Sequence, residues 1–267
     1  FDGLAAKGSM LGSAAVIVWL DARIHPNKDV YGMRLLPNGA TGWASQGIVL
    51  YDNEGSTTYS CRVIPDDEGG TWTLASVYGG FFYATPTVRT NPIGIRIAKG
   101  DFGAISFSPV FDYDVSPDGQ GGVLLALPAV DLGVGRLDAT GATLWFFVAT
   151  LHGAGTAEAT VIPCSDGGMI VAWRDDRLIA NEDDVYAQRV TGDGSVLWAP
   201  DGALVSRADS TQRAPALASD GNDGAIVAWT DDRNAWLLRE SDVYAQRVDR
   251  WGKLGNPEPA IAAVKDV

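Results

Sequence analysis

Short runs of alternating apolar and polar residues follow one another along the chain, and each run ends at a turn rich in Gly, Asp or Asn. One pattern occurs twice almost unchanged: MIVAWRDDRLIANEDDVYAQRV at Met169–Val190 and AIVAWTDDRNAWLLRESDVYAQRV at Ala225–Val248. Each copy predicts a β-hairpin with an apolar strand, a charged corner, a variable loop and a second strand. A third copy at Val16–Leu35 contains VIVWLDAR followed by DVYGMRL. The recurrence predicts an architecture assembled from similar β units.

Five such repeats fill the chain. Turns rich in Asp and Gly separate the first and second strands at Lys7–Ser13, Asp66–Gly70, Asp118–Gly122, Asp166–Gly168 and Asp220–Gly224. Four short strands per repeat, without helical periodicity, predict an all-β protein, a five-bladed β-propeller built from four-stranded antiparallel blades. The expected repeats of this single domain span about 1–52, 53–108, 109–152, 153–208 and 209–267. A β-solenoid usually has shorter coils, and a β-sandwich has no reason to repeat.

Two sets of residues recur inside the repeats. The expected third strands each contain an arginine, and these are Arg34, Arg96, Arg136, Arg189 and Arg247. We expect them to be largely buried and bonded to Asp or to backbone carbonyls. Three repeats also contain W-x-D-x-R, at Trp19/Asp21/Arg23, Trp173/Asp175/Arg177 and Trp229/Asp231/Arg233. Their recurrence favours a structural strand end over a ring of ligand-binding carboxylates, because a binding site needs to be made only once.

The combined pattern W-x-D-x-R…D-V-Y-A-Q-R-V…G-x-x-L-W…D-G resembles repeats of large secreted or surface-attached bacterial proteins that are taken to be β-propellers. The match is close in repeats one, four and five and partial in repeats two and three, which lack W-x-D-x-R. The resemblance implies a β-propeller and an extracellular or cell-surface location, and it implies no single activity. Pro65–Trp72, PDDEGGTW, is also similar to the Asp-box of sialidases, which in those families is a fold-stabilising turn.

The charge balance restricts the partners. With 20 Lys and Arg against 33 Asp and Glu, the net charge is −13, which disfavours nucleic acid and anionic membranes and leaves protein or glycan partners open. No apolar run reaches the roughly 20 residues of a membrane-spanning helix, so membrane insertion is not expected. The two cysteines, Cys61 and Cys164, are expected as buried thiols, with a disulfide between them as the alternative.

Metal and histidine chemistry have little support in the sequence. The acidic loop Asn181–Asp184, with Asp175 and Asp176, has oxygen ligands for calcium, but it lacks the spacing of a dedicated loop, and Arg177 and Arg189 are near enough in sequence to neutralise it. His25 and His152 are the only histidines, and neither lies beside a nucleophile motif. No metal site and no cofactor is therefore expected.

Carboxylates offer the best route to catalysis. Asp112, Asp114 and Glu158 lie on or near expected first strands, and Glu54 lies close to another. In a propeller, first strands line the central channel, where two acids at a suitable separation hydrolyse glycosides. This pattern predicts, as an alternative, a glycoside hydrolase or a lectin-like carbohydrate-binding propeller that uses central-channel carboxylates.

The variable loops favour a different function. They follow the second strands at Ile24–Lys28, Tyr78–Asn91, Leu178–Asp183 and Asn234–Ser241. Two of them contain apolar side chains, Phe81 and Phe82 in one and Trp236 and Leu237 in the other, which predict a ligand-binding rim. Our main hypothesis from the sequence is thus a non-enzymatic extracellular binding or assembly module that presents these loops.

Overall fold

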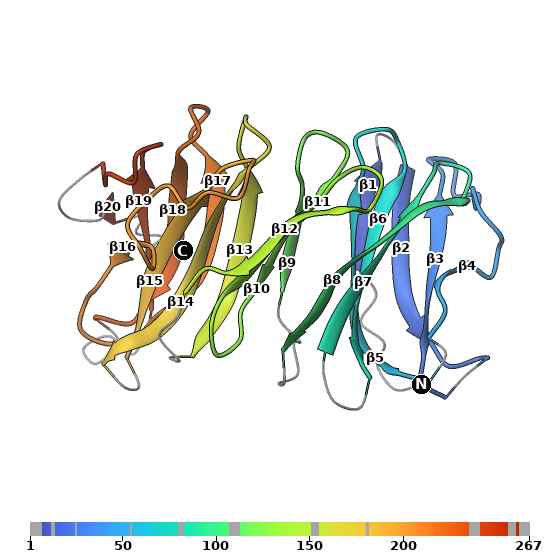
Figure 1. The fold of residues 1–267 in the computed structure, drawn as a ribbon, viewed down its shortest axis with the longest axis horizontal. Coiled ribbons are helices and arrows are strands. Elements are labelled where there is room, and N and C mark those ends of the chain that lie inside the picture. The colour runs from blue at the N-terminus through green and yellow to red at the C-terminus, as the bar shows by residue number, and fades with distance from the viewer. Residues whose placement is uncertain are drawn as a thin grey trace. The chain divides into compact units, whose positions relative to one another are not determined.

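The computed structural model describes residues 7–11, 14–24, 26–53, 55–79, 83–106, 113–150, 155–179, 182–234, 241–255 and 260–261. These residues form five four-stranded sheets, and in each sheet the strands are neighbours in sequence order (Figure 1). Sheet 1 consists of β1 (Lys7–Leu11), β2 (Ala14–Asp21), β3 (Asp29–Leu35) and β4 (Ile48–Tyr51). Sheet 2 consists of β5 (Thr57–Pro65), β6 (Thr71–Tyr78), β7 (Tyr83–Thr90) and β8 (Arg96–Ser106).

The remaining sheets follow the same plan. Sheet 3 consists of β9 (Asp114–Pro117), β10 (Val123–Leu127), β11 (Gly133–Leu137) and β12 (Thr143–Val148). Sheet 4 consists of β13 (Thr156–Pro163), β14 (Met169–Ile179), β15 (Glu182–Val190) and β16 (Ala203–Ser206). Sheet 5 consists of β17 (Gln212–Ser219), β18 (Ala225–Asp231), β19 (Asp242–Val248) and β20 (Ala260–Ile261). The prediction of an all-β fold of antiparallel sheets is confirmed.

The contacts divide the chain into two compact units. Unit 1 comprises Phe1–Phe111, Gly119–Val123 and Gly135–Leu144, and unit 2 comprises Asp112–Asp118, Leu124–Val134 and Trp145–Val267. Sheets 1 and 2 therefore belong to unit 1, sheets 4 and 5 belong to unit 2, and the residues of sheet 3 are divided between the two. The described part of the chain contains no helix with the length and apolar character of a membrane span.

The repeated hairpin has the same register in sheets 1, 4 and 5. Its tryptophan stands opposite the tyrosine of D-V-Y, in the pairs Trp19↔Tyr31, Trp173↔Tyr186 and Trp229↔Tyr244. The paired rings are stacked, with centroids 6.0–6.2 Å apart. Such cross-strand aromatic pairs stabilise a sheet and fix its register, which explains why these residues recur.

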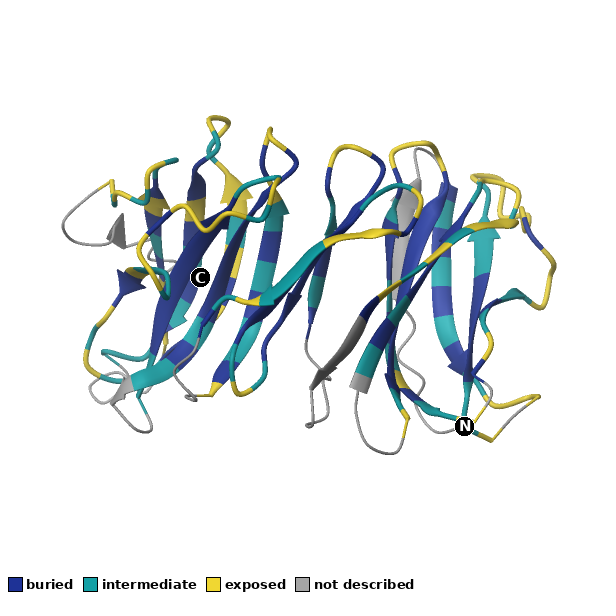
Figure 2. Ribbon diagram, in the orientation of Figure 1, coloured by how far each residue is buried: buried dark blue, intermediate teal, exposed yellow. Residues whose placement is uncertain are grey.

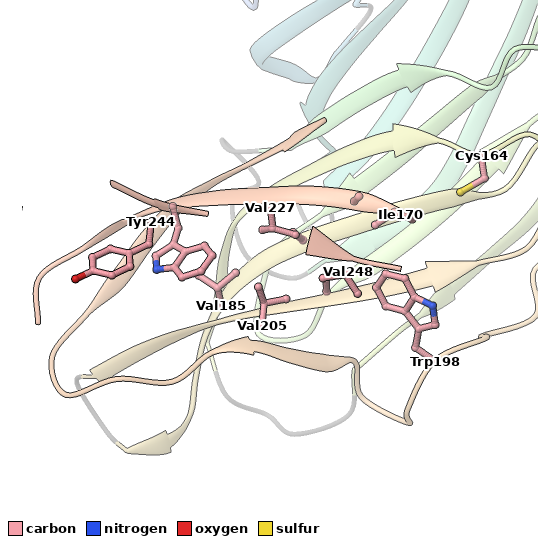
Figure 3. Close-up of a cluster of buried hydrophobic side chains, with 12 residues drawn as sticks. Cys164, Ile170, Val185, Trp198, Val205, Val227, Tyr244 and Val248 are labelled. Atoms are coloured by element: carbon pink, nitrogen blue, oxygen red, sulfur yellow. The ribbon is translucent and has the colours of Figure 1, made fainter. Parts of the chain in front are cut away.

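Apolar side chains of neighbouring sheets form the cores (Figure 2). In unit 1, Val16 and Val18 of sheet 1 pack with Cys61 and Ala75 of sheet 2. In unit 2, one cluster joins sheets 4 and 5 through residues that include Cys164, Val185, Trp198, Val205, Val227 and Tyr244 (Figure 3). Both cysteines are buried free thiols, so the alternative of a disulfide is wrong.

Arginine and tryptophan side chains tie each sheet to the next within a unit. Each side chain donates a hydrogen bond to a backbone carbonyl of the following sheet, at the second residue of the turn between its third and fourth strands. In unit 1 the bonds are Arg34 Nη1 to Pro92 O (2.6 Å), Trp43 Nε1 to Pro92 O (3.1 Å) and Arg89 Nη1 to Ala139 O (3.0 Å). In unit 2 they are Trp145 Nε1 to Gly192 O (3.1 Å), Trp198 Nε1 to Arg250 O (3.1 Å) and Arg189 Nη1 to Arg250 O (3.4 Å).

The prediction for the recurrent arginines holds in part. Arg136 and Arg189 are buried, and Arg34 is half-buried and bonded as expected. Arg247 is bonded to Asp220 as expected, but it is exposed, so the prediction of its burial is wrong. The prediction for Arg96 is wrong, because Arg96 begins the fourth strand of sheet 2 and is exposed. Arg89 holds the equivalent place, since it lies on β7 and binds Asp66. The expected long loop Tyr78–Asn91 is in fact mostly strand β7. The sequence prediction therefore took the fourth strand of sheet 2, which contains Arg96, for the third.

Candidate functional site

The W-x-D-x-R corner is a closed hydrogen-bond unit. Asp175 accepts bonds from Trp173 Nε1 (2.9 Å), from the Arg177 backbone N–H (3.0 Å) and from Arg177 Nε (2.8 Å). The Arg177 guanidinium also lies 3.9 Å from the centroid of the Tyr186 ring and donates to the Asp201 carbonyl. Every part of the corner is thus engaged in the scaffold, as the structural interpretation of the sequence predicts.

The three corner carboxylates are held ionised. Hydrogen bonds from Arg23 first, and from Trp19, lower the pKa of Asp21 to about 2 against the opposing effect of burial. For Asp175 and Asp231 burial acts to raise the pKa, but the bonds from the arginine and tryptophan outweigh it and leave the pKa below its ordinary value. An acid held in this way cannot donate a proton near neutral pH.

The aspartate that begins D-V-Y behaves differently in sheet 4. In sheet 1, Asp29 accepts the Asn53 backbone N–H (3.0 Å), and in sheet 5, Asp242 accepts the side-chain amide of Asn234 (3.0 Å). Asp184 has the same register position, yet no described residue donates a hydrogen bond to it. A buried carboxylate without donors is destabilised in its charged form.

Asp184 lines a pocket of about 170 Å³ in unit 2 together with Glu182, Arg207, Ala208 and Asp209. Glu182 and Asp184 are two residues apart on β15 and therefore face the same side of sheet 4. The opposite wall is the connection between β16 and β17. Gln212 holds that connection, because its Nε2 donates to Ser210 O (2.7 Å) and to Ala208 O (3.3 Å).

Burial raises the pKa of Asp184 to about 6, with Arg207 opposing the rise and the carboxylates of Asp175 and Glu182 adding to it. Only 6% of Asp184 is exposed. The pocket thus combines one carboxyl that retains a proton in mildly acidic solution, a second carboxylate and a guanidinium. A carboxyl that keeps its proton in this pH range is what general acid catalysis requires.

A second polar cluster lies at the same end of sheet 4 and involves the predicted acid Glu158. Its carboxylate accepts the backbone N–H of Ala214 (2.6 Å) and lies 3.5 Å from Arg174 Nε. Glu158 and Ala214 occupy bulges in the first strands of sheets 4 and 5, with φ of 52° and 50°. Arg174 also binds Asp183 (2.7 Å). Left-handed backbone at non-glycine residues is costly and is found at functional sites, so Glu158 belongs to the candidate site.

The other acids predicted to line a channel divide into two groups. Asp114 is engaged in the scaffold, since its Oδ2 accepts the Val161 N–H (3.0 Å) and the Thr160 hydroxyl (3.1 Å). Asp112 and Glu54 lie outside the described residues. So do the four residues of the predicted rim, Phe81, Phe82, Trp236 and Leu237, and both histidines, His25 and His152.

The calcium hypothesis for the acidic loop finds no geometric support in the described part of the chain. Asp175 is bonded to Arg177 and Asp183 to Arg174. No group of three or more His, Cys, Asp or Glu among the described residues is arranged to hold a metal ion. Arg174 was not anticipated as a partner, because it precedes the W-x-D-x-R aspartate and has no equivalent in the other copies.

Sequence reasoning did not single out Asp184 as a proton donor. Its burial was foreseeable, because alternation along β15 places it on the same side as Tyr186 and Gln188. The Glu182-Asp183-Asp184 run was a further signal, since the carboxylates of Glu182 and Asp183 add to the rise in the pKa of Asp184. The missing hydrogen-bond donors, in contrast, depend on the fold.

No protein-family model matches the chain, and no curated protein matches it. Solved structures, in contrast, do match the chain. An ulvan lyase of a new polysaccharide lyase family, bound to -[GlcA(1-4)Rha3S]-, has a TM-score of 0.56 and 13% identity over 95% of this chain and 69% of its own. A Dyadobacter fermentans protein of unknown function has a TM-score of 0.53 and 9% identity over 95% of this chain and 81% of its own. An exo-1,5-α-L-arabinanase from a bovine ruminal metagenomic library has a TM-score of 0.44 and 11% identity, over 98% and 96% of the two chains.

At these identities the likeness shows the fold, which is all-β and propeller-like. The finding also bears on the main hypothesis from the sequence. The chain matches a polysaccharide lyase over nearly its whole length, so the prediction of a non-enzymatic binding or assembly module is wrong, and the carbohydrate-active alternative is favoured.

Proposed function

We propose that this protein is a carbohydrate-active enzyme that cleaves a glycan at the Asp184 pocket of unit 2. The observation behind the proposal is the contrast among the three D-V-Y aspartates: Asp29 and Asp242 have hydrogen-bond donors, whereas Asp184 has none and lies in a pocket with its pKa raised to about 6. Asp184 donates a proton to the leaving oxygen as the glycosidic C–O bond breaks, and the carboxylate of Glu182 accepts the proton of the attacking water in hydrolysis or of the sugar carbon in elimination.

The cluster around Glu158 supports this assignment. Register places the beginning of β13 opposite Asp175 and Arg174, at the end of sheet 4 that also contains Asp184. Glu158 and Arg174 supply an acceptor and a cation, which suit the hydroxyls and any acidic group of a sugar. The fold relationship to an ulvan lyase is consistent with a glycan as the ligand.

The test is a cleavage screen of neutral and acidic polysaccharides with the wild-type chain, Asp184→Asn and Asp242→Asn. Reducing ends reveal all cleavage, and ultraviolet absorbance of an unsaturated product separates elimination from hydrolysis. We expect Asp184→Asn to lower kcat by about 10²–10⁴-fold, while Asp242→Asn, the matched position in sheet 5, retains the rate. The rate should fall as pH rises through about 6, where Asp184 loses its proton. Full activity in Asp184→Asn would refute the proposal.

We also propose that the five sheets are the blades of one β-propeller, and that the protein acts outside the cell. The repeating ties from one sheet to the turn of the next support the first statement, and the resemblance of the repeats to secreted bacterial proteins supports the second. A compact chain of 267 residues has a radius of gyration of about 18 Å. Small-angle scattering that gave a much larger value would contradict the single propeller.

A further inference from the structure

A second polar pocket, of about 360 Å³, lies in unit 1, remote in sequence from the residues discussed above. Its lining comes from the end of β4, the loop that follows and the beginning of β8, and consists of Tyr51, Asp52, Asn53, Ser56, Arg96 and Lys99. A smaller recess of about 100 Å³ adjoins it and shares four of these residues. The volume falls in the range of small-molecule sites, about 300–1,000 Å³.

The two cations of this pocket have no side-chain partner in the part of the chain that the structure describes. Neither Arg96 nor Lys99 forms an ion pair or a side-chain hydrogen bond with another described residue, in contrast to Arg34 and Arg89, whose guanidiniums bind backbone carbonyls. Among the described residues of the lining Asp52 is the only carboxylate, so their charges sum to +1 in a chain whose net charge is −13. An isolated positive pocket on an acidic protein selects anions, because the rest of the surface repels them.

The wall of the pocket is fixed before any ligand binds. Asn53 is buried, and its Nδ2 donates to Ser56 O (2.7 Å) and to the Thr58 hydroxyl (2.7 Å), while its backbone N–H is bound by Asp29 (3.0 Å). The half-buried ring of Tyr51 forms one side, and burial raises the pKa of its hydroxyl. A fixed wall lowers the entropic cost of binding.

We propose that this pocket binds an acidic sugar residue, with the carboxylate or sulfate on Arg96 and Lys99 and the ring hydroxyls near Asp52 and Ser56. Guanidinium and ammonium groups form strong charge-assisted bonds with both anions, and an aromatic side chain packs on the apolar face of a sugar ring. The sugar part of the ligand rests on the function proposed above, whereas the negative charge follows from the pocket alone. The site is an accessory binding site in unit 1, separate from the reaction at Asp184.

Calorimetry on the Asp184→Asn chain tests the proposal without cleavage. The probes are tetragalacturonate for the carboxylate, a sulfated galactan tetrasaccharide for the sulfate, and neutral arabinotetraose. We expect the anionic probes to bind and the neutral probe to bind about tenfold more weakly. Binding should weaken between about 0.01 M and 0.15 M salt. The anionic probe that binds with the lower Kd identifies the group, carboxylate or sulfate, that the pocket prefers.

Charge-matched variants separate the pocket from the overall charge. Lys99→Gln and Lys253→Gln remove the same charge, but Lys253 is exposed in unit 2, outside the pocket. We expect Lys99→Gln and Arg96→Gln each to raise Kd about five- to tenfold, Lys253→Gln to leave it unchanged, and Asp52→Asn to lower it. Equal effects of Lys99→Gln and Lys253→Gln, equal binding of the neutral probe, or no binding of either anionic probe overturns the proposal. Failure of the Asp184 proposal instead appears as reducing ends released by Asp184→Asn, a readout distinct from the comparison of Kd between Lys99→Gln and Lys253→Gln.

Discussion

Arg89 and Arg247 allow the energetic role of the recurrent arginines to be measured against an internal control. Each donates from Nε to the turn aspartate of its own sheet at 2.9 Å, Arg89 to Asp66 and Arg247 to Asp220. Their surroundings differ, since the Arg89 side chain is 7% exposed and that of Arg247 is 51% exposed. Arg89 also donates to Ala139 O of the next sheet. The pair thus compares one ion pair in two environments.

The expected cost follows from burial. Truncation of Arg89 leaves the buried Asp66 carboxylate without its guanidinium, and breaking a buried pair costs about 3–5 kcal/mol. Arg247→Ala removes a solvent-screened partner, which is worth about 0–1 kcal/mol. Both aspartates keep two bonds from backbone N–H groups of their own turns, so the exposure of the arginine is what differs between the two variants. We therefore expect Arg89→Ala to destabilise the protein several times more than Arg247→Ala.

Thermal and urea unfolding, followed by tryptophan fluorescence and by far-ultraviolet circular dichroism, provide the measurement. At about 2–4 °C per kcal/mol, Arg89→Ala should lower Tm by about 6–20 °C and Arg247→Ala by less than about 4 °C. Equal losses in the two variants would refute the reasoning, and they would mean that the exposed face of Arg247 is covered in the protein. An unchanged Tm in both Arg89→Ala and Arg189→Ala would show that the arginines are not structural at all.

Three further outcomes are expected. Because its folded pKa is raised to about 6, Asp184 contributes stability that is complete below pH 4 and is lost as pH rises through 6. We therefore expect urea unfolding to show Asp184→Asn as more stable than the wild type by roughly 2–3 kcal/mol at pH 7 and equal to it at pH 4. Asp175 has a lowered pKa and contributes stability that is lost as pH falls below about 4, so the acid-induced loss should be smaller in Asp175→Asn, measured by an acid titration of circular dichroism. Gly39→Ala should lower the free energy of unfolding by about 1–2 kcal/mol for its positive φ alone. Gly252→Ala should lower it by about 1–3 kcal/mol more, because a Cβ there lies 2.8 Å from the Trp198 ring. Equal melting temperatures of the two variants would contradict this.

The sequence predicts the second strands well, but the turn predicted at Lys7–Ser13 is wrong, because Lys7–Leu11 forms strand β1. The second strands begin at Ala14, Thr71, Val123, Met169 and Ala225, each within one residue of the predicted start. Alternation and Asp-Gly turns are local signals, and each strand needs only its own residues to be recognised. The W-x-D-x-R corner was also foreseeable as a structural element, because it satisfies its own hydrogen bonds within five residues.

Sheet 2 shows where local signals fail. Its sequence lacks the W-x-D-x-R corner, and so Tyr78–Asn91 was interpreted as a loop and Arg96 as the structural arginine. The partner that identifies Arg89 is Asp66, 23 residues earlier, and the pairing of Trp72 with Arg89 across β6 and β7 becomes visible only with the register. A long-range bond of this kind leaves no periodic trace in a single sequence.

The candidate site was less predictable still, and the reason is physical. The pKa of a carboxyl depends on the donors and charges around it, and these come from other strands. Asp29, Asp184 and Asp242 share the D-V-Y motif, and the acidic residues before Asp184 are the one local difference. The lack of hydrogen-bond donors at Asp184 becomes visible only beside the contacts of Asn53 and Asn234 with the other two aspartates.

The repeats themselves provide a criterion for separating scaffold from function. Where a position keeps its partners from sheet to sheet, as the corner aspartates do, selection for the fold is a sufficient explanation. Asp184 departs from this rule, since it lines a pocket and is bonded to no described side chain, whereas Asp29 and Asp242 at the same register position are bonded. Arg96, at the beginning of the fourth strand of sheet 2, also lines a pocket and is bonded to no described side chain. A buried acid to which no described residue donates a hydrogen bond costs free energy that the fold does not require, whereas Arg96 and Lys99 are exposed and carry no such cost. A ligand that bonds to these groups accounts for their retention, and we therefore expect the glycan itself to raise the melting temperature of the wild-type chain more than that of Asp184→Asn or Arg96→Gln.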